Sequence, residues 1–320
     1  MKNLLLFSTL FAALCISLVL ACGKKLTPTS GPTTTWTSSL HYTPQTFAIT
    51  AGRDTIVMGK DSTVLHFYPN SFMTSTGNII TTGSINIQLI EMYSPGAMIA
   101  NGATTATTDG SLLNSGGQVY IKASMNGQEV FANKYGLGFR QPGSSTTPME
   151  IFYGSTGNAD SAVKWTVSDT TKTGTTAAGT STDSSASTTT NPHPNFMYIF
   201  DSCTSFSWIN CDQFSGNGAQ DKIFFQVPDA TYTSANTIVF FVLPGTNSVE
   251  KGEYSGDGKF LIAHIAGNVA YKAVGITNKN NSYYYWEQTG TTTNDHSVIT
   301  VPMAMAPETL GDIITRLHGL

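Results

Sequence analysis

The chain has 320 residues, of which 11% are charged, and its formal net charge at pH 7 is −4. Soluble proteins carry about 25% charged residues on average, so Thr, Ser, Gly and Asn must supply much of the polar surface. This composition favours a β-rich protein, because strands favour Thr, Val, Ile and Tyr, and turns favour Gly and Asn. The small net charge and the lack of a Lys/Arg stripe exclude nucleic acid as an expected partner, because phosphate binding relies on clustered basic residues.

The first 22 residues have the order of elements found in exported proteins. Lys2 precedes an almost wholly apolar run, Leu4 to Ala21, which stops at Val19-Leu20-Ala21-Cys22. A positive start, an apolar middle and a small residue before the cut predict a secretory signal peptide. Because a cysteine follows the cut, the segment resembles a bacterial lipoprotein signal, in which Cys22 is acylated and becomes the mature N-terminus. An uncleaved membrane anchor is the alternative, since the run approaches the about 18 to 20 residues that span a bilayer.

The residues after Cys22 predict a tether. They are rich in Pro, Gly, Thr and Ser and have no apolar period, which is typical of a flexible linker. We therefore expect a signal peptide at 1–21, a lipidated tether at 22–39 and a lipid anchor that makes the outer membrane a partner. Lys24 and Lys25 favour its periplasmic face over the cell surface, because related surface-exported lipoproteins tend to carry acidic residues at these positions.

Residues 40–165 alternate between apolar and polar side chains, which is the period of a half-buried β-strand. The runs are Phe47/Ile49, Ile56/Met58, Val64/His66/Tyr68, Ile85/Ile87/Leu89, Val119/Ile121/Ala123, Val130/Ala132, Met149–Tyr153 and Ala162–Val167. Asn126-Gly127 lies between two runs and predicts a hairpin, because a type I′ turn needs positive φ at both positions. We expect this stretch to form one β-sandwich domain.

Residues 166–194 are dominated by Thr and Ser and predict a linker, because they cannot offset their own ordering entropy. β-periodic runs resume over residues 195–320. They are Phe196–Phe200, Phe206–Ile209, Ile223–Val227, Thr237–Leu243, Lys259–Ile265, Val269–Ile276, Tyr283–Glu287 and Ser297–Val301. We expect a second β-sandwich here.

The last residues predict one helix, which we expect to pack on the second domain. After Pro307 the apolar residues follow at the one-sided spacing of an amphipathic helix: Leu310, Ile313, Ile314 and Leu317. The predicted fold class is all-β, with two mostly antiparallel β-sandwich-like domains and one C-terminal amphipathic helix. A single interleaved β domain with a long Thr/Ser loop is the alternative.

Two strings in the chain resemble a known β-sandwich module. They are Phe67-Tyr68-Pro69-Asn70-Ser71-Phe72 and the run from Gly83 to Glu91, in which a Pro-x-x-Phe turn precedes a strand ending in Ile-Glu. The pattern resembles the ZU-type domain of ankyrins and netrin receptors. It is more similar to uncharacterised envelope lipoproteins of Gram-negative bacteria, which also carry the elements matching Leu112, Ser115–Ala123 and Trp208–Asp212.

This resemblance covers about half of the mature chain and implies a non-enzymatic interaction module, with no ligand residues to transfer. The residues themselves agree with a β module. Gly116-Gly117 ahead of a strand predicts a sharp turn, and Pro69 predicts a strand end, where no backbone donor is required.

Cys203 and Cys211 remain once the signal peptide and the lipid anchor are set aside. In an oxidising compartment their spacing permits a disulfide bond. Two buried thiols that never meet are the alternative, because spacing does not fix geometry.

The sequence contains no pattern that predicts catalysis or a metal site. Its six histidines lack the i, i+4 or His-x-His spacing that places two nitrogens on one metal. There is no Gly-x-Ser-x-Gly elbow, phosphate loop or dinucleotide fingerprint. We therefore expect no enzyme activity, no cofactor and no metal. Glu91 and Glu129 are expected on a solvated strand face.

Tyr283, Tyr284, Tyr285 and Trp286 are the candidate ligand-binding residues. On a strand, Tyr283 and Tyr285 share one face and Tyr284 and Trp286 the other. One pair must face the core, and the other could stack on sugar rings or contact a protein. A covering helix or loop is the alternative.

Three functions follow from these patterns. The favoured one is a membrane-anchored lipoprotein that acts as a non-enzymatic structural or protein-interaction module of the cell envelope. The second is a carbohydrate-binding accessory lipoprotein that uses the aromatic strand, and the third is a hydrolase whose site is unknown. The expected partner is thus an envelope protein or a glycan, and the exposure of Trp286 separates the second function from the first.

Overall fold

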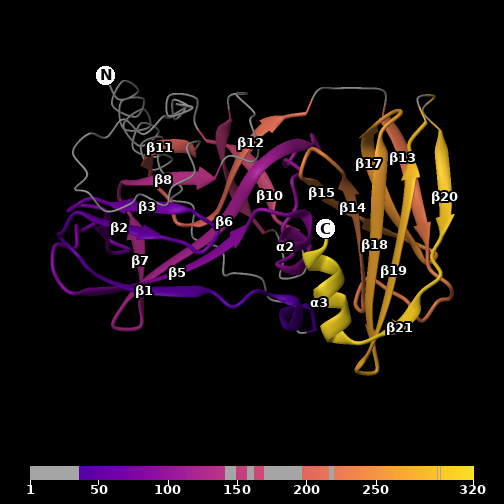
Figure 1. The fold of residues 1–320 in the computed structure, drawn as a ribbon, viewed down its shortest axis with the longest axis horizontal. Coiled ribbons are helices and arrows are strands. Elements are labelled where there is room, and N and C mark those ends of the chain that lie inside the picture. The colour runs from indigo at the N-terminus through magenta and orange to yellow at the C-terminus, as the bar shows by residue number, and fades with distance from the viewer. Residues whose placement is uncertain are drawn as a thin grey trace, which may run out of the picture.

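The computed structural model describes residues 36–140, 149–156, 162–168, 197–215, 220–293, 295 and 297–320. Strands make up 56% of it and helices 8%, so the all-β prediction is confirmed. Two β-sandwiches lie end to end along the longest axis, with short helices between them (Figure 1). The predicted signal peptide, Cys22 and most of the predicted tether and of the Thr/Ser-rich segment lie outside the described residues.

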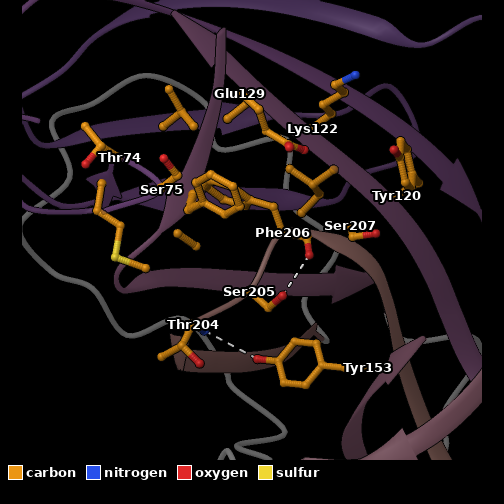
Figure 2. A pocket seen from close by; sticks show the side chains of 16 residues that line it. Thr74, Ser75, Tyr120, Lys122, Glu129, Tyr153, Thr204, Ser205, Phe206 and Ser207 are labelled. Carbon is orange, nitrogen blue, oxygen red and sulfur yellow. Dashed lines mark hydrogen bonds between the residues drawn. The ribbon is translucent and has the colours of Figure 1, made fainter. Parts of the chain in front are cut away.

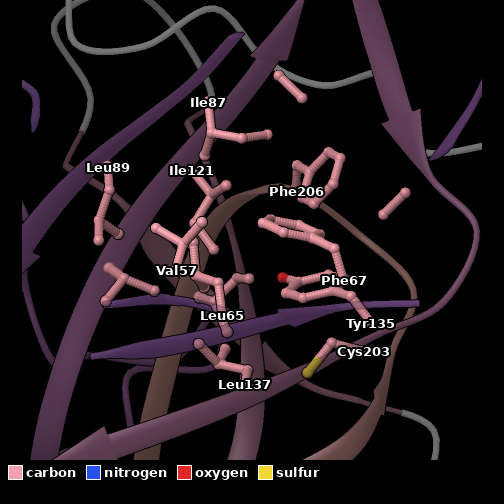
Figure 3. Close-up of a cluster of buried hydrophobic side chains, with 14 of the residues drawn as sticks. Val57, Leu65, Phe67, Ile87, Leu89, Ile121, Tyr135, Leu137, Cys203 and Phe206 are labelled. Carbon is pink, nitrogen blue, oxygen red and sulfur yellow. The ribbon is translucent and has the colours of Figure 1, made fainter. Parts of the chain in front are cut away.

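The N-terminal sandwich consists of two antiparallel sheets. The first sheet follows the order β1 (Gln45–Thr50), β5 (Ser84–Met92), β6 (Leu113–Met125), β12 (Ser207–Phe214), β9 (Glu150–Ser155) and β10 (Lys164–Val167), and β7 (Gln128–Ala132) joins β6 to β4 (Phe72–Met73). The second sheet follows the order β11 (Met197–Cys203), β8 (Tyr135–Arg140), β3 (Val64–Phe67) and β2 (Thr55–Met58). Alternate side chains of both sheets meet in a core that includes Val57, Leu65, Phe67, Ile121 and Leu137 (Figure 3).

The C-terminal sandwich also has two sheets. One follows the order β16 (Glu253–Gly256), β17 (Lys259–Ala266), β13 (Gln220–Gln226) and β20 (Val298–Pro302). The other follows the order β15 (Ser248–Lys251), β14 (Thr237–Leu243), β18 (Ala270–Lys279), β19 (Ser282–Thr291) and β21 (Ala306–Glu308). The pair β13–β20 is parallel, whereas the other pairs in the two sheets are antiparallel.

The predicted boundary between the domains is wrong. Strands β11 and β12 were expected in the second domain, but β12 pairs with β6 and β9, and β11 pairs with β8. The N-terminal sandwich therefore extends to Ser215, and the C-terminal one begins at Gln220. The Thr/Ser-rich segment connects β10 to β11 within one sandwich, because its flanking strands belong to the two sheets of that sandwich.

The C-terminal helix is confirmed as α3 (Leu310–His318), and it packs on the second sandwich as predicted, with the Arg316 guanidinium 5.2 Å from the centroid of the Tyr285 ring. The Thr309 hydroxyl caps it by accepting a hydrogen bond from the Asp312 amide at 3.1 Å. It lies against α2 (Pro95–Ala100), a fully buried helix of the N-terminal sandwich that the sequence analysis missed (Figure 1). Among the described residues, neither helix has the length or apolar character needed to cross a bilayer.

A shared apolar core joins the two sandwiches. The N-terminal sandwich contributes Leu40, Ile90, Met92, α2, Leu113, Phe152, Val163, Trp165 and Trp208, and the C-terminal one contributes Ile238, Phe240, Val242, Val249, Val274, Ile276, Tyr285, Ile313 and Leu317. A backbone hydrogen bond also links the two sandwiches: the Thr105 amide donates to the Val249 carbonyl at 2.7 Å. Burying each large apolar side chain stabilises the folded state by about 1.5–3 kcal/mol. The shared core therefore holds the two sandwiches together as one body.

The last residues of the expected tether belong to this body. Thr37–Leu40 forms a short 3₁₀ helix, η1. The Trp36 indole donates to the Ala235 carbonyl at 3.1 Å, and the hydroxyls of Ser39 and Tyr283 lie 2.7 Å apart. The predicted tether end at residue 39 is therefore wrong by at least four positions, because residues 36–39 contact the C-terminal sandwich.

Two glycine predictions had different outcomes. Asn126 and Gly127 have φ values of 52° and 78° between β6 and β7, which confirms the hairpin. Gly116-Gly117 is a β-bulge inside β6, because both residues lie opposite Cys211 alone. A Cβ on Gly117 would lie 2.4 Å from the Tyr93 ring, so only glycine fits there.

Candidate functional site

The first sheet forks where β6 changes partner. Ser207 of β12 lies opposite Ile121, whereas Val130 of β7 lies opposite Ala123. Lys122, between them, pairs with Gln88 of β5 on one side but with neither β12 nor β7 on the other. The fork opens a gap in a sheet that is continuous elsewhere along β6.

A pocket of about 370 Å³ lies in this fork, and we call it the fork pocket (Figure 2). It falls in the size range of small-molecule sites. Its lining residues come from five segments of the N-terminal sandwich. They are Met73–Ser75, Tyr120–Ala123, Glu129–Ala132, and Tyr153 with Thr204–Ser207.

Ser207 is the most unusual residue of the fork pocket. Its φ is 94°, in the left-handed region that serine rarely adopts. The residue is 9% exposed, and its hydroxyl is buried with no hydrogen-bond partner among the described residues. Such backbone strain costs about 1–3 kcal/mol and collects at functional sites. A strained residue with an unpaired buried hydroxyl therefore marks this pocket as the candidate site.

The neighbouring residue holds Ser207 in this conformation. The Phe206 ring packs in the core with its centroid 5.1 Å from that of Tyr135 and 6.1 Å from that of Phe72. The Tyr135 hydroxyl donates to the Ser205 carbonyl at 2.9 Å. Core packing on one side and strand pairing on the other thus fix the backbone at Ser207.

The walls of the fork pocket are uncharged at neutral pH. Burial raises the pKa of Tyr153, so its hydroxyl stays protonated, and it accepts from the Thr204 amide at 3.4 Å (Figure 2). The charged residues of the lining, Lys122 and Glu129, are both exposed and carry opposite charges. The pocket therefore offers apolar and hydroxyl groups inside and a balanced pair of charges outside.

A larger hollow of about 640 Å³ lies where the two sandwiches meet. Its lining includes Asn114, Ser115, Thr246, Asn247 and Lys272. None of the buried polar atoms that lack a partner in the described chain belongs to its lining residues. The fork pocket is therefore the stronger candidate, because its lining includes Ser207, whose backbone is strained.

Three carboxyl groups are buried away from the fork pocket. Glu91 is 2% exposed, which corrects the prediction that it lies on a solvated face; Glu129 is exposed as predicted. The Glu91 carboxylate accepts from the Thr63 amide at 2.9 Å and from the Asp61 amide at 3.0 Å, so it fastens the β2–β3 turn to β5.

Burial raises the pKa of Asp212 well above its usual value and that of Glu250 to about 8.

Cys203 and Cys211 are free thiols, so the disulfide that their spacing permits is not formed. They lie on β11 and β12, in different sheets, and both side chains point into the core of the N-terminal sandwich. Burial raises the pKa of Cys203 to about 12 and also raises that of Cys211. Both thiols are therefore unreactive, because the thiolate is the nucleophile.

The aromatic strand presents no exposed platform. Tyr283 and Tyr285 do share one face of β19, and Tyr284 and Trp286 the other, but Trp286 is only 7% exposed. Its ring packs against Phe225 with centroids 5.7 Å apart. Of the two possibilities left by the sequence, an exposed pair and a covered one, the structure has the covered one: the shared core covers one face of this sheet and the partner sheet covers the other.

No three His, Cys, Asp or Glu side chains gather at a point that could hold a metal ion, within the ranges that the structure describes. The predicted lipidation site Cys22 lies outside those ranges. Comparison with family models, with curated proteins and with solved structures gives no match.

Proposed function

We propose that the protein is a lipoprotein anchored in the outer membrane through Cys22, and that its folded part is a non-enzymatic protein-interaction module of the cell envelope. The signal-like N-terminus supports the anchor. The observation that carries the interaction role is an apolar row on the outer face of the second sheet of the N-terminal sandwich, with exposed side chains at both of its ends.

This apolar row runs between the two edges of the sheet; its ends are exposed, whereas Gly138 in its middle is buried. Met58 on β2 lies opposite Val64 on β3, Val64 opposite Gly138 on β8, and Gly138 opposite Ile199 on β11. Met58 is 40% exposed and Ile199 is 39% exposed, and Ile56, in the neighbouring row, is 62% exposed. Exposed apolar side chains that gather on a sheet face, as Ile56 and Met58 do on β2, mark an interaction site, because water disfavours them.

Two acidic residues border this surface. Asp54 is exposed, and its carboxylate oxygen lies 2.9 Å from Nε2 of His66. Asp201 is exposed on β11. Both charges act on the nearby Tyr68, where they help burial to raise its pKa. The surface therefore fits a partner protein with an apolar contact patch that is bordered by a basic side chain.

The shared core supports a scaffolding role. Because the two sandwiches are joined through α2, α3 and the apolar residues between them, a protein bound on the second sheet is held at a fixed position relative to the far end of the body. A flexible pair of domains would not fix that distance.

Photo-crosslinking in cells tests the interaction surface. A photoreactive residue at Ile56 or Ile199 of the full-length chain should give adducts of the same mass, whereas one at Thr50, exposed on β1 of the other sheet, should not. Adding Met58→Asp should abolish the adducts without unfolding the protein, because Met58 is 40% exposed. Equal labelling from all three positions would overturn the proposed surface.

Replacing Cys22 tests the anchor. Each buried methylene contributes about 0.8 kcal/mol, so two or more acyl chains hold a protein in a bilayer. Cys22→Ser should release the protein into the soluble fraction or leave it as an uncut precursor. Cys15→Ser, inside the apolar run, is the matched control and should leave the protein in the membrane. A processed Cys22→Ser protein of unchanged mobility in the membrane fraction would contradict the anchor.

A further inference from the structure

We infer that two copies of this chain associate by pairing their β20 strands (Val298–Pro302) across a twofold axis, so that a sheet of one C-terminal sandwich continues into that of the other. β20 is the last strand of its sheet, and it lies on the side of the C-terminal sandwich that faces away from the N-terminal one (Figure 1). The inference depends neither on the membrane anchor nor on the apolar row, which belongs to the other sandwich.

The outer edge of β20 presents backbone groups to a further strand. β20 pairs with β13 on one side, and no strand of the described chain pairs with it on the other. Directly after the strand, the Met303 amide donates to the Gln226 carbonyl at 2.8 Å. Because backbone groups alternate in direction along a strand, the odd-numbered residues of β20 point theirs toward β13. Val298 and Thr300 therefore point both N–H and C=O outward, and Pro302, which has no N–H, loses no bond to β13.

β20 lacks the protection that the other edges of this sandwich have. β16 carries Glu253 and a bulge, and β21 has three residues and contains Pro307. The backbone of Val249 on β15 is bonded to Thr105 of the N-terminal sandwich. β20 has no charged residue and no bulge, and Val298 is 63% exposed. An uncharged and regular edge strand of this kind is a template for pairing with another chain.

A second copy fits this edge because the strand complements itself. In an antiparallel pair in which Ile299 faces Ile299 of the second copy, Val298 lies opposite Thr300 in both directions. Every outward N–H and C=O of these two residues then finds a partner, and no like charges meet. Centring the pair on Thr300 would place Val298 opposite Pro302, which has no N–H to donate. Centring it on Val298 would place Thr300 opposite a residue that precedes the strand.

Sedimentation equilibrium of the mature chain, residues 22–320 with Cys22→Ser, measures the association. Thr300→Pro removes an outward N–H from each copy and leaves the bonds to β13 in place, so the Kd of the dimer should rise about tenfold to a hundredfold. Thr300→Val keeps the N–H and should leave the Kd unchanged. An unmodified chain that is monomeric at every concentration, or equal weakening by the two variants, would overturn the inference.

Cysteine cross-linking keeps the inference testable if Thr300→Pro does not fold. Ile299→Cys would place two thiols across the twofold axis, where the Cα atoms of a non-hydrogen-bonded pair lie about 4.5 Å apart, within reach of a disulfide. Pro302→Cys is the control, because its two copies would lie about 20 Å apart along the strands. Mild oxidation of cells that express the full-length chain should give an adduct of twice the chain mass from Ile299→Cys alone. Equal yields from both variants, or an adduct with a different protein, would overturn the inference.

Discussion

The two sandwiches differ in where their strained backbone lies and in how many of their buried polar atoms lack a partner in the described chain. The N-terminal one contains the bulge at Gly116-Gly117, the fork at Lys122 and the strained Ser207. It also holds nearly all the buried side-chain atoms without a partner in the described chain, on Gln118, Ser207, Trp208 and Asp212, whereas the C-terminal one contributes Glu250. Non-glycine residues with positive φ in the C-terminal sandwich lie in turns between strands.

This difference indicates a division of roles. Unpaired polar groups and strained backbone lower stability, so they persist only where the surroundings hold them in place. The C-terminal sandwich packs α3 and one face of β14 and β18 against the N-terminal sandwich through the shared core. We interpret it as the support that lets the N-terminal sandwich keep an irregular site.

Removing a large side chain from the shared core should lower stability more than the other changes, and it should destabilise both sandwiches. Trp165 is fully buried there, and its indole donates to the Thr104 carbonyl. Trp165→Ala should lower the free energy of unfolding by about 3–5 kcal/mol. Hydrogen exchange at the amides of β18, in the other sandwich, should accelerate.

Phe72→Ala is the matched control for this experiment, because Phe72 is buried in the core of the N-terminal sandwich alone. Phe72→Ala should lower the free energy of unfolding by a similar amount, but it should accelerate hydrogen exchange in β18 less than Trp165→Ala does. Equal acceleration by the two variants would mean that the shared core has no special part in coupling the sandwiches.

Forcing α2 and α3 apart should have the next largest effect. A Cβ on Gly96 would lie 1.6 Å from the Leu317 carbonyl oxygen, which is backbone and cannot rotate away. Gly96→Ala should therefore cost about 1–3 kcal/mol or more through overpacking. Gly311→Ala on α3 is the control, since only the Thr309 hydroxyl lies near, at 3.9 Å, and it should stabilise by about 0.5–1 kcal/mol. Thermal unfolding measures both, and a neutral Gly96→Ala would contradict the close contact.

The pH dependence of stability should reflect Glu250, which lies at the junction. Burial raises its pKa from 4.5 to about 8, with Lys164 of the N-terminal sandwich opposing the shift and Glu253 adding to it. The folded state thus binds a proton that the unfolded state has released, so stability falls as pH rises between about 4.5 and about 8. The slope for one group is at most about 1.4 kcal/mol per pH unit.

Glu250→Gln should remove this part of the slope and make the protein relatively more stable at the upper end of the window. Urea unfolding at several pH values measures it. Glu253→Gln is the control, because Glu253 is exposed and its loss should leave most of the slope. An unchanged slope in Glu250→Gln would exclude Glu250 as its source.

Local patterns in the sequence predicted the strands better than the way they assemble. The run Thr237–Leu243 matches β14 at both ends, and the Asn126-Gly127 turn is present, because hairpins and strand periods depend on neighbouring residues. β8 was missed although Tyr135, Leu137 and Phe139 alternate there, since the intervening glycines are depleted in strands.

The candidate site could not be predicted from the sequence. The fork pocket joins segments that are up to about a hundred and thirty residues apart in the chain. The positive φ of Ser207 cannot be inferred from its residue type, because serine rarely adopts it. The same limit explains the wrong domain boundary. Strand β12 follows a Thr/Ser-rich segment that looks like a linker, but only the pairing of β12 with β6 and β9 reveals its domain.

Cutting the chain between β10 and β11 should have the smallest effect on assembly. A protease site introduced within residues 169–196 would separate β11 and β12 covalently from the strands that they pair with. β11 would still pair with β8, and β12 with β6 and β9, so the two fragments should elute together without denaturant. The control is the same site placed between Ser215 and Gln220, where the shared core and α3 should hold the fragments together. If the first cut released a fragment that began before β11 and contained the whole C-terminal sandwich, β11 and β12 would belong to the second domain after all.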